Sequence, residues 1–224
     1  RRLTNIAAGG ADTDAVNVSQ LKSLSDTVAA QKIKYFSVKS TGGTNEDNKG
    51  ATGNDAIAIG KNASATQSGS LAVGLHAVAT GEFGSAVGFN NNASGSNSSA
   101  FGNGNISSGS FSSTSGLANI ASGDFSSALG FRNLADKAAS SAVGFRNNAT
   151  GDNSTAVGNA NEASGGFGAA FGIANIASGE ASSALGNRNT ADKEASSAVG
   201  FKNKATGSNS TAVGNANEAS GGFS

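Results

Sequence analysis

A glycine recurs every fourteen residues, without interruption, from Gly60 to Gly214. Twelve glycines share this spacing: Gly60, Gly74, Gly88, Gly102, Gly116, Gly130, Gly144, Gly158, Gly172, Gly186, Gly200 and Gly214. A period kept so strictly is typical of a solenoid, in which every period forms one coil that stacks on the next. The sequence therefore predicts a solenoid of fourteen-residue coils over residues 51–224.

The coil divides into two similar halves. When the repeat glycine is position 0, alanine fills positions −2 and +5 in every coil except at Thr114 and Ser107, and a second glycine usually fills position +7. We expect each half to be a short strand of about five residues that ends in a glycine-assisted turn. Gln67, Lys137 and Lys193 replace the second glycine, so we expect those three turns to differ in shape.

Small residues are predicted to fill the inside of the coil. Side chains alternate along a strand, so the alanine at −2 shares a face with the serine at −4, and the alanine at +5 shares one with the residue at +3. Position +3 is asparagine in ten successive coils, from Asn91 to Asn217. Stacked asparagines can form a hydrogen-bonded amide ladder, although asparagine also simply suits turns.

An apolar column lies at position −1, and Ser115 is its one exception. If alanines fill the inside, this column points out of the coil along the whole solenoid. Burying a large apolar side chain is worth roughly 1.5–3 kcal/mol, so the column is predicted to be covered by another subunit. The predicted interface residues are Ile59, Val73, Val87, Phe101, Leu129, Val143, Val157, Phe171, Leu185, Val199 and Val213.

An internal duplication supports this division into inner and outer columns. Residues 126–167 and 182–223 align without gaps at an offset of four coils. They differ only at Phe131/Asn187, Leu134/Thr190, Ala138/Glu194, Arg146/Lys202, Asn148/Lys204 and Asp152/Ser208. None of these positions is a glycine or a predicted inward position. The outer face of the second strand carries variable polar residues and is predicted to be solvated.

The segment before the solenoid has a different character. Residues 1–16 are predicted to be a neck-like connector in which Asp12 or Asp14 can cap a helix. Residues 17–32 are predicted to be a short coiled-coil helix, because Leu21, Leu24 and Val28 recur at spacings of three and four. Such a helix needs partner helices for stability; a solitary helix packed on the solenoid end is the alternative. Residues 33–50 are predicted to be a strand followed by a connecting loop.

Composition excludes several functional classes. The formal net charge is zero and there is no basic run, which argues against nucleic-acid binding. The chain has no cysteine, and His76 is its only histidine, so no catalytic set, metal site or cofactor site is predicted. No apolar run is long enough to cross a bilayer. Because the chain begins at Arg1 and has no methionine, we expect it to be a piece of a longer protein.

The repeats resemble the heads of trimeric autotransporter adhesins of the YadA type. Ser140-Ser-Ala-Val-Gly144, Ser154-Thr-Ala-Val-Gly158 and Asp55-Ala-Ile-Ala-Ile-Gly60 are similar to that head's repeat. Leu3-Thr-Asn-Ile-Ala-Ala-Gly9 and Asp14-Ala-Val-Asn-Val-Ser-Gln-Leu21 resemble the family's neck, although here the neck precedes the head. The resemblance implies an all-β fold: a left-handed, single-stranded parallel β-roll that forms an intertwined homotrimer.

The resemblance also implies a function at the bacterial cell surface. It implies attachment to host cells or extracellular matrix, a C-terminal outer-membrane anchor outside this sequence, and no enzymatic activity. The alternative is a structural spacer that projects a more distal binding head. The sequence identifies neither the ligand nor the binding patch.

Overall fold

The computed structural model describes residues 3–30 and 39–224. The chain forms two compact units, residues 1–39 and residues 40–224, and each is considered by itself. The larger unit contains all the strands and the smaller unit contains one helix. The predicted strand over residues 33–39 falls almost entirely outside the described residues.

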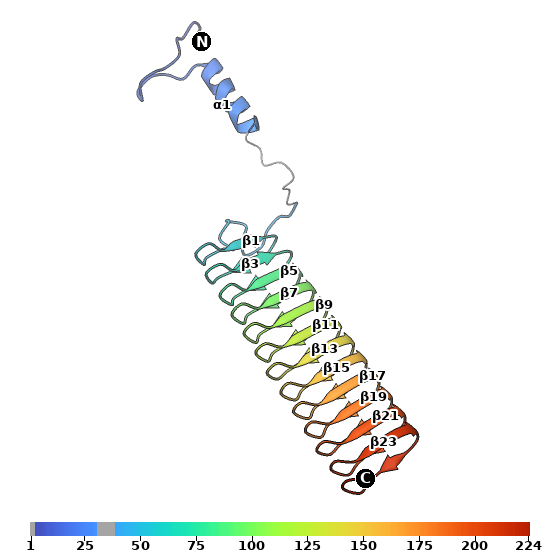
Figure 1. The fold of residues 1–224 in the computed structure, drawn as a ribbon. Coiled ribbons are helices and arrows are strands. Elements are labelled where there is room, and N and C mark those ends of the chain that lie inside the picture. The colour runs from blue at the N-terminus through green and yellow to red at the C-terminus, as the bar shows by residue number, and fades with distance from the viewer. Residues whose placement is uncertain (1–2, 31–38) are drawn as a thin grey trace. The chain divides into compact units, whose positions relative to one another are not determined.

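The larger unit is a parallel β-solenoid, or β-roll, and the predicted all-β fold is confirmed (Figure 1). Its strands form two twelve-stranded parallel sheets, one of the odd-numbered strands and one of the even-numbered strands. The odd-numbered strands are β1 Ile57–Ile59, β3 Leu71–Val73, β5 Ser85–Phe89, β7 Ser99–Asn103, β9 Ser113–Leu117, β11 Ser127–Phe131, β13 Ser141–Phe145, β15 Thr155–Asn159, β17 Ala169–Ile173, β19 Ser183–Asn187, β21 Ser197–Phe201 and β23 Thr211–Asn215. The even-numbered strands are β2 Ser64–Ala65, β4 Val78–Ala79, β6 Asn92–Ala93, β8 Ile106–Ser107, β10 Ile120–Ala121, β12 Leu134–Ala135, β14 Asn148–Ala149, β16 Glu162–Ala163, β18 Ile176–Ala177, β20 Thr190–Ala191, β22 Lys204–Ala205 and β24 Glu218–Ala219.

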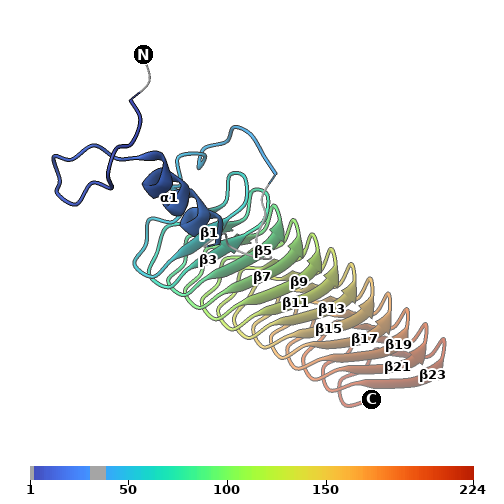
Figure 2. The same ribbon diagram turned by 90° about the horizontal axis from the view of Figure 1, so that it is seen from above.

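The register of both sheets is the sequence repeat itself. Each residue of a strand pairs with the residue fourteen positions further on, as Ala128 pairs with Ala142 and Gly130 with Gly144. Seen from the second direction, the coils remain aligned in one continuous stack (Figure 2). Identical positions of the repeat therefore form columns that run the length of the roll.

The two strands of a coil differ in length, which corrects the expectation of two five-residue strands. From β5 onward each odd strand has five residues and each even strand has two. From β5 onward the repeat glycine lies inside the odd strand, where it adopts φ values of +115° to +122°. A Cβ atom on Gly144 would overlap the carbonyl oxygen of Gly158 in the next coil. Only glycine fits there, because it tolerates both the positive φ and the close approach of the backbones.

The corners of the coil are formed by residues that are mostly not glycine. Position +2 and position +9 have φ values near +55° in every coil, including Arg132 at +53° and Phe125 at +59°. Each of these positions comes two residues after a glycine position. The turns therefore depend on left-handed residues of several kinds, which usually cost free energy when they are not glycine.

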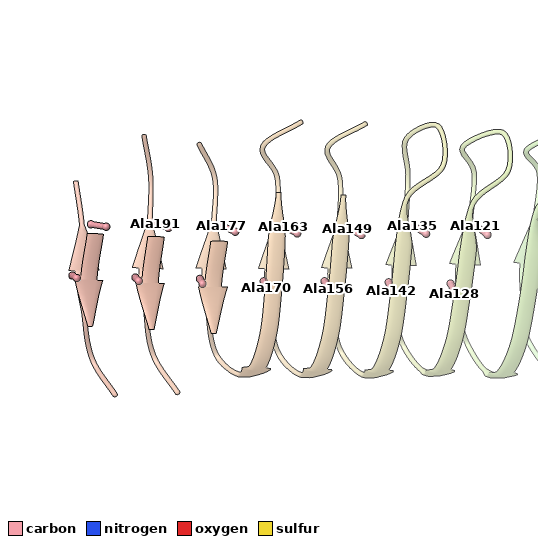
Figure 3. Packing of buried hydrophobic residues seen from close by; sticks show 14 residues of the cluster. Ala121, Ala128, Ala135, Ala142, Ala149, Ala156, Ala163, Ala170, Ala177 and Ala191 are labelled. Carbon is pink, nitrogen blue, oxygen red and sulfur yellow. The ribbon is translucent and has the colours of Figure 1, made fainter. Parts of the chain in front are cut away.

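The inside of the roll is filled as predicted. The alanines at −2 and +5 and the asparagines at +3 are almost all buried, and so are the serines at −4. Figure 3 shows the two alanine columns facing each other between the sheets, as for Ala128 and Ala135. The apolar residues at −1 lie on the opposite face of the odd strand and are partly or largely exposed. The lumen is therefore closed by small side chains.

One coil interrupts the alanine core. The core consists of two clusters, one that ends at Ala100 and one that begins at Ala121. Between them lie Ser107 and Thr114, the two exceptions in the alanine columns. Their hydroxyl groups are 2.7 Å apart across the lumen, and Ser107 Oγ also donates to the carbonyl oxygen of Ser99 at 2.6 Å. Each of the two buried hydroxyl groups therefore has the other as a hydrogen-bond partner.

The asparagine column forms the predicted amide ladder. Asn133 Nδ2 lies 3.0 Å from Asn119 Oδ1, and the Asn133 backbone N–H donates to the same oxygen at 3.0 Å. The same amide group donates to the carbonyl oxygens of Leu129 and Gly144 at 2.8 Å. This pattern recurs from Asn91 to Asn203, so the buried amides satisfy one another along the roll.

The turns that lack the second glycine differ by one hydrogen bond. In a glycine turn such as that at Gly151, the backbone N–H donates to the carbonyl oxygen of Ala163 in the next coil at 3.2 Å. No corresponding bond is present at Gln67, Lys137 or Lys193, although the i to i+3 turn bond remains in all three. A Cβ atom at this position approaches the next coil's carbonyl, which accounts for the lost bond.

The helix α1 spans Val18–Ala30, close to the predicted range. Its N-cap is Asn17, which corrects the expectation of Asp12 or Asp14. Asn17 Oδ1 accepts from the Gln20 N–H at 3.1 Å, and Gln20 Oε1 accepts from the Asn17 N–H at 3.2 Å, a reciprocal capping box. Asp14 instead accepts from the N–H groups of Gly10 and Ala11 in the preceding turn. Hydrogen bonds from Ala11 and Gly10 lower the pKa of the Asp14 carboxyl.

Candidate interaction surfaces

The apolar column at −1, here called the apolar stripe, is the largest candidate surface of the roll. Its members come from the middle of the odd strands, which hold them in line because the sheet is in register. The larger members are substantially exposed, including Phe101 at 43% and Phe171 at 39%, whereas the valines before the last odd strand are half-buried. Because the opposite face of the same strands is the closed lumen, these side chains have no site inside their own coil. A continuous exposed apolar row of this length is typical of a protein interface.

The smaller unit also exposes apolar side chains. Leu21, Leu24 and Val28 of α1 are each about 60% exposed, and no residue of the helix is buried. The connector adds Leu3 and Val16, which line a shallow hollow with neighbouring residues. These side chains lie within the predicted connector and helix. They contact too little of their own chain to be buried by it.

Aromatic stacks are the feature that the sequence reasoning missed. Phe131 and Phe145 stack in neighbouring coils with ring centroids 5.1 Å apart, and Arg132 and Arg146 lie over these rings at 5.2 and 5.1 Å. Lys202 lies over the Phe201 ring at 5.0 Å. The sequence contains a pattern that predicts these stacks, namely aromatic–basic dipeptides fourteen residues apart. These dipeptides place cations at one corner of the coil.

A second aromatic stack occupies the other corner. Phe111 and Phe125 stack at 5.1 Å with nearly parallel rings, and both remain more than half exposed. They sit at position +9, where Phe83, Phe167 and Phe223 also lie and where the remaining coils carry alanine, asparagine or glycine in the same left-handed conformation. The fold therefore does not require phenylalanine at this position.

Nothing in the described part of the chain forms a chemical centre. No group of three or more metal-ligating side chains occurs among the described residues. His76 is exposed, as expected, and lies near the Asn62 amide at 3.3 Å. Among residues 3–30 and 39–224, no helix has the length and apolar character needed to span a membrane.

Comparison with known families agrees with this architecture. The YadA head domain repeat matches residues 79–105, 121–147, 135–161, 149–173, 177–203, 191–217 and 205–224, which together make up more than half of the chain. The chain belongs to the trimeric autotransporter adhesins, and it carries a YadA head. The family of the coiled stalk of trimeric autotransporter adhesins matches residues 2–68. No curated protein matches the chain.

The stalk match ends within the roll, ten residues before the first head match begins. The stalk match extends to residue 68 and so includes β1 and β2, which belong structurally to the first coil. The adhesin's roll therefore begins before the head repeats are recognised. Proteins of this family form trimers, are displayed at the cell surface and are anchored in the outer membrane, and they are generally not enzymes.

Proposed function

We propose that this adhesin forms a homotrimer in which the apolar stripes of three rolls meet around a common axis. The observation that carries the proposal is the exposed apolar stripe opposite a lumen already closed by alanine. Roughly 1.5–3 kcal/mol per large apolar side chain favours covering it. The proposed interface comprises Ile59, Val73, Val87, Phe101, Leu129, Val143, Val157, Phe171, Leu185, Val199 and Val213 of the roll, with Leu21, Leu24 and Val28 of the helix.

The helical part supports the same assembly. An isolated helix of thirteen residues is marginal in water, and α1 has no buried residue. Three such helices would cover Leu21, Leu24 and Val28 in a short coiled coil. Residues 1–16 would then act as a neck between this coiled coil and an earlier part of the fibre, and residues 51–224 as the head.

The oligomeric state can be tested directly. Light scattering of the purified protein should give the mass of three chains. Val143→Lys together with Val157→Lys should dissociate or unfold the trimer, because six lysines would be placed in its apolar centre. Asn148→Lys is the matched control, since Lys204 occupies the same position in the duplicate. A folded, monomeric wild-type protein would contradict the proposed trimer.

We further propose that the trimer is a non-enzymatic adhesin head that attaches bacteria to host cells or extracellular matrix. Threefold repetition of a surface multiplies weak contacts, so low affinity per chain can give firm attachment. The described residues offer extended surfaces and no enclosed chemical site, which suits a large ligand better than a small one. Binding of the trimer to immobilised matrix proteins and to cultured cells tests this proposal.

A structural spacer is the alternative function. Twelve coils at about 4.8 Å each give a roll of roughly 55–60 Å, enough to project a more distal head. Deleting residues 126–181 removes four coils and joins Phe125 to Ser182, which preserves the register because Ser182 is the duplicate of Ser126. Unchanged adhesion by this deletion variant would favour the spacer. Lost adhesion by a still trimeric variant would favour the binding head.

A further inference from the structure

Most charged side chains of the roll lie at its two edges, and the balance of charge differs between these edges. One edge is the turn after each odd strand, positions +1 and +2, and the other is the turn after each even strand, positions +6 to +9. From Gly60 to Gly214 the first edge contains cations and no carboxylate, and we call it the basic edge. The second contains most of the carboxylates, and we call it the acidic edge; its carboxylates are Asp55, Glu82, Asp124, Asp136, Asp152, Glu180, Asp192 and Glu194. Lys137 and Lys193 also lie on this edge, each directly after an aspartate, so carboxylates outnumber cations there.

Within residues 3–30 and 39–224, none of these charges forms an ion pair. Among the described residues the ion pair found is between Lys49 and Asp47, in the loop before the roll. Arg132, Arg146 and Lys202 lie over phenyl rings instead. On the other edge, Asp124 accepts from the Ser110 N–H at 2.8 Å and Asp136 from the Ser122 hydroxyl at 2.6 Å. Three cations of the basic edge and two carboxylates of the acidic edge are therefore held in place by contacts within the chain.

The two edges carry charge at the same levels. Each turn of the basic edge lies between two successive turns of the acidic edge, one before it and one after it along the chain. Arg132 and Arg146 are thus flanked by the turns of Asp124, Asp136 and Asp152. Arg188 and Lys202 are flanked by the turns of Glu180, Asp192 and Glu194. Residues 84–121 carry no charged side chain on either edge. Every carboxylate of the acidic edge except Glu82 lies in a turn next to a lysine or arginine of the basic edge.

The duplication preserves this match through compensating changes. Lys202 corresponds to Arg146, and the turn that follows it has lost a carboxylate, because Ser208 replaces Asp152. The turn that precedes it has gained one, because Glu194 replaces Ala138. The cation therefore has two carboxylates in its neighbouring turns in both copies, one on each side of Arg146 and both in the turn before Lys202. Half of the six differences between the copies are accounted for by this exchange.

We infer that the basic edge of one protomer lies against the acidic edge of the next in the homotrimer. The inference rests on the proposed trimer. In a ring of three, each protomer presents two different surfaces to its two neighbours, so unlike edges meet. Rotation about an axis parallel to the roll keeps every residue at its own level, and only equal levels then come together. The level match found within one chain is what such an arrangement requires.

The charges would fix the alignment more than the strength of the assembly. The apolar stripe repeats in every coil, so a slip by one coil still places apolar against apolar. The charges occur in two blocks separated by uncharged coils, so they distinguish one alignment from most others. Exposed ion pairs contribute little stability each, but complementary charge steers association and disfavours wrong partners.

Cross-linking can test which edges meet, because the chain contains no cysteine. The variant Arg132→Cys/Asp124→Cys places thiols on opposite edges at neighbouring levels, separated within one chain by the whole strand β11. A short bismaleimide should convert it to covalent trimers on a denaturing gel. The control Arg132→Cys/Glu82→Cys has its thiols three coils further apart, roughly 14 Å, and should remain monomeric on the gel.

Each outcome separates this inference from the proposed trimer. Light scattering of the same variants reports assembly without cross-linker. If the first variant is a trimer by light scattering but forms no covalent product, the edge pairing is wrong and the proposed trimer is unaffected. Cross-linking of both variants overturns the level match. Monomers before treatment would show that the proposed trimer itself fails, and the edge pairing with it.

Charge exchange provides a second test that needs no cross-linker. Arg132→Glu/Arg146→Glu should lower the thermal midpoint of the trimer at low salt by about 3 °C or more. Adding Asp124→Lys/Asp136→Lys/Asp152→Lys to the same chain should restore most of the loss. If the arginine changes leave the midpoint unaltered at every salt concentration but abolish retention on a sulfated-polysaccharide column, the basic edge faces solvent and binds polyanions, and the inference is wrong.

Discussion

Residues 126–167 and 182–223 are duplicates, and they show that the inner columns of the roll have changed far less than the outer columns. Every buried alanine, serine and asparagine of the first copy has the same residue in the second. The six substituted positions are exposed or half-buried in both copies. The lumen is closed by contacts in which a single methyl group matters, whereas the outer face has room for charge and size to change. Position in the coil therefore determines which substitutions the roll tolerates.

The largest effect is expected where backbone and lumen constraints coincide. Gly144→Ala would place a Cβ atom against the Gly158 carbonyl at a φ of +118°, so we expect a loss of about 2–5 kcal/mol in the free energy of unfolding. Urea unfolding followed by circular dichroism at fixed protein concentration measures it. Gly151→Lys is the matched control: its Cβ would also meet a carbonyl of the next coil, but its φ is not positive, and Lys137 and Lys193 already occupy its column. It should cost about 1 kcal/mol, the value of the one hydrogen bond that those turns lack. Equal losses for both variants would contradict the distinction between the two glycine columns.

The asparagine ladder should give the next largest effect. Asn133→Ala removes a buried amide that serves Leu129, Gly144 and both neighbouring rungs, so we expect a loss of about 2–3 kcal/mol. Thermal unfolding of the trimer at matched concentration measures this change. Asn148→Ala, on the exposed face of the following even strand, should cost less than about 0.5 kcal/mol. A comparable loss at Asn148 would mean that asparagine acts here through turn preference.

The polar pair in the lumen should show strong coupling at a smaller scale. Ser107→Ala leaves the Thr114 hydroxyl buried without its partner, and Thr114→Ala does the same to Ser107, so each should cost about 1–2 kcal/mol. The double variant recreates an ordinary alanine coil and should cost less than the sum. A double-mutant cycle measures the difference. Strict additivity would show that the two hydroxyls act independently.

The filling of the lumen can be predicted from the sequence because the inward columns contain only small residues. A coil of fourteen residues leaves space only for small groups, and the two alanine columns lie seven residues apart, so their facing arrangement follows from spacing alone. Even the exceptions Thr114 and Ser107 fall seven apart, and the structure places their hydroxyls together. The ladder likewise follows from one column of identical residues in register.

Other features depend on backbone geometry that composition does not express. The sequence predicts that the repeat glycine ends a strand. In the structure Gly130 instead pairs with Gly144 inside a five-residue strand, because glycine can continue the strand pairing at positive φ. The corners are instead formed by residues such as Arg132 in the left-handed conformation. Without knowing where the corners lie, the sequence could not show that cations and carboxylates occupy opposite edges. The sequence predicts Asp12 or Asp14 as the helix cap because it places Asn17 inside the helix, whereas Asn17 is the N-cap.

The smallest effect is expected from exchanging outer residues between the copies. Asn148→Lys and Lys204→Asn each introduce a side chain that the corresponding exposed position of the other copy already carries, with φ, pairing and lumen unchanged. We expect each to alter the free energy of unfolding by less than about 0.5 kcal/mol and to leave the trimer mass unchanged. Because neither residue lies on the proposed stripe or at a corner, a loss of assembly in either variant would place the even strand in a subunit interface. A change in adhesion without a change in assembly would instead assign ligand contact to the outer face of β14 and β22.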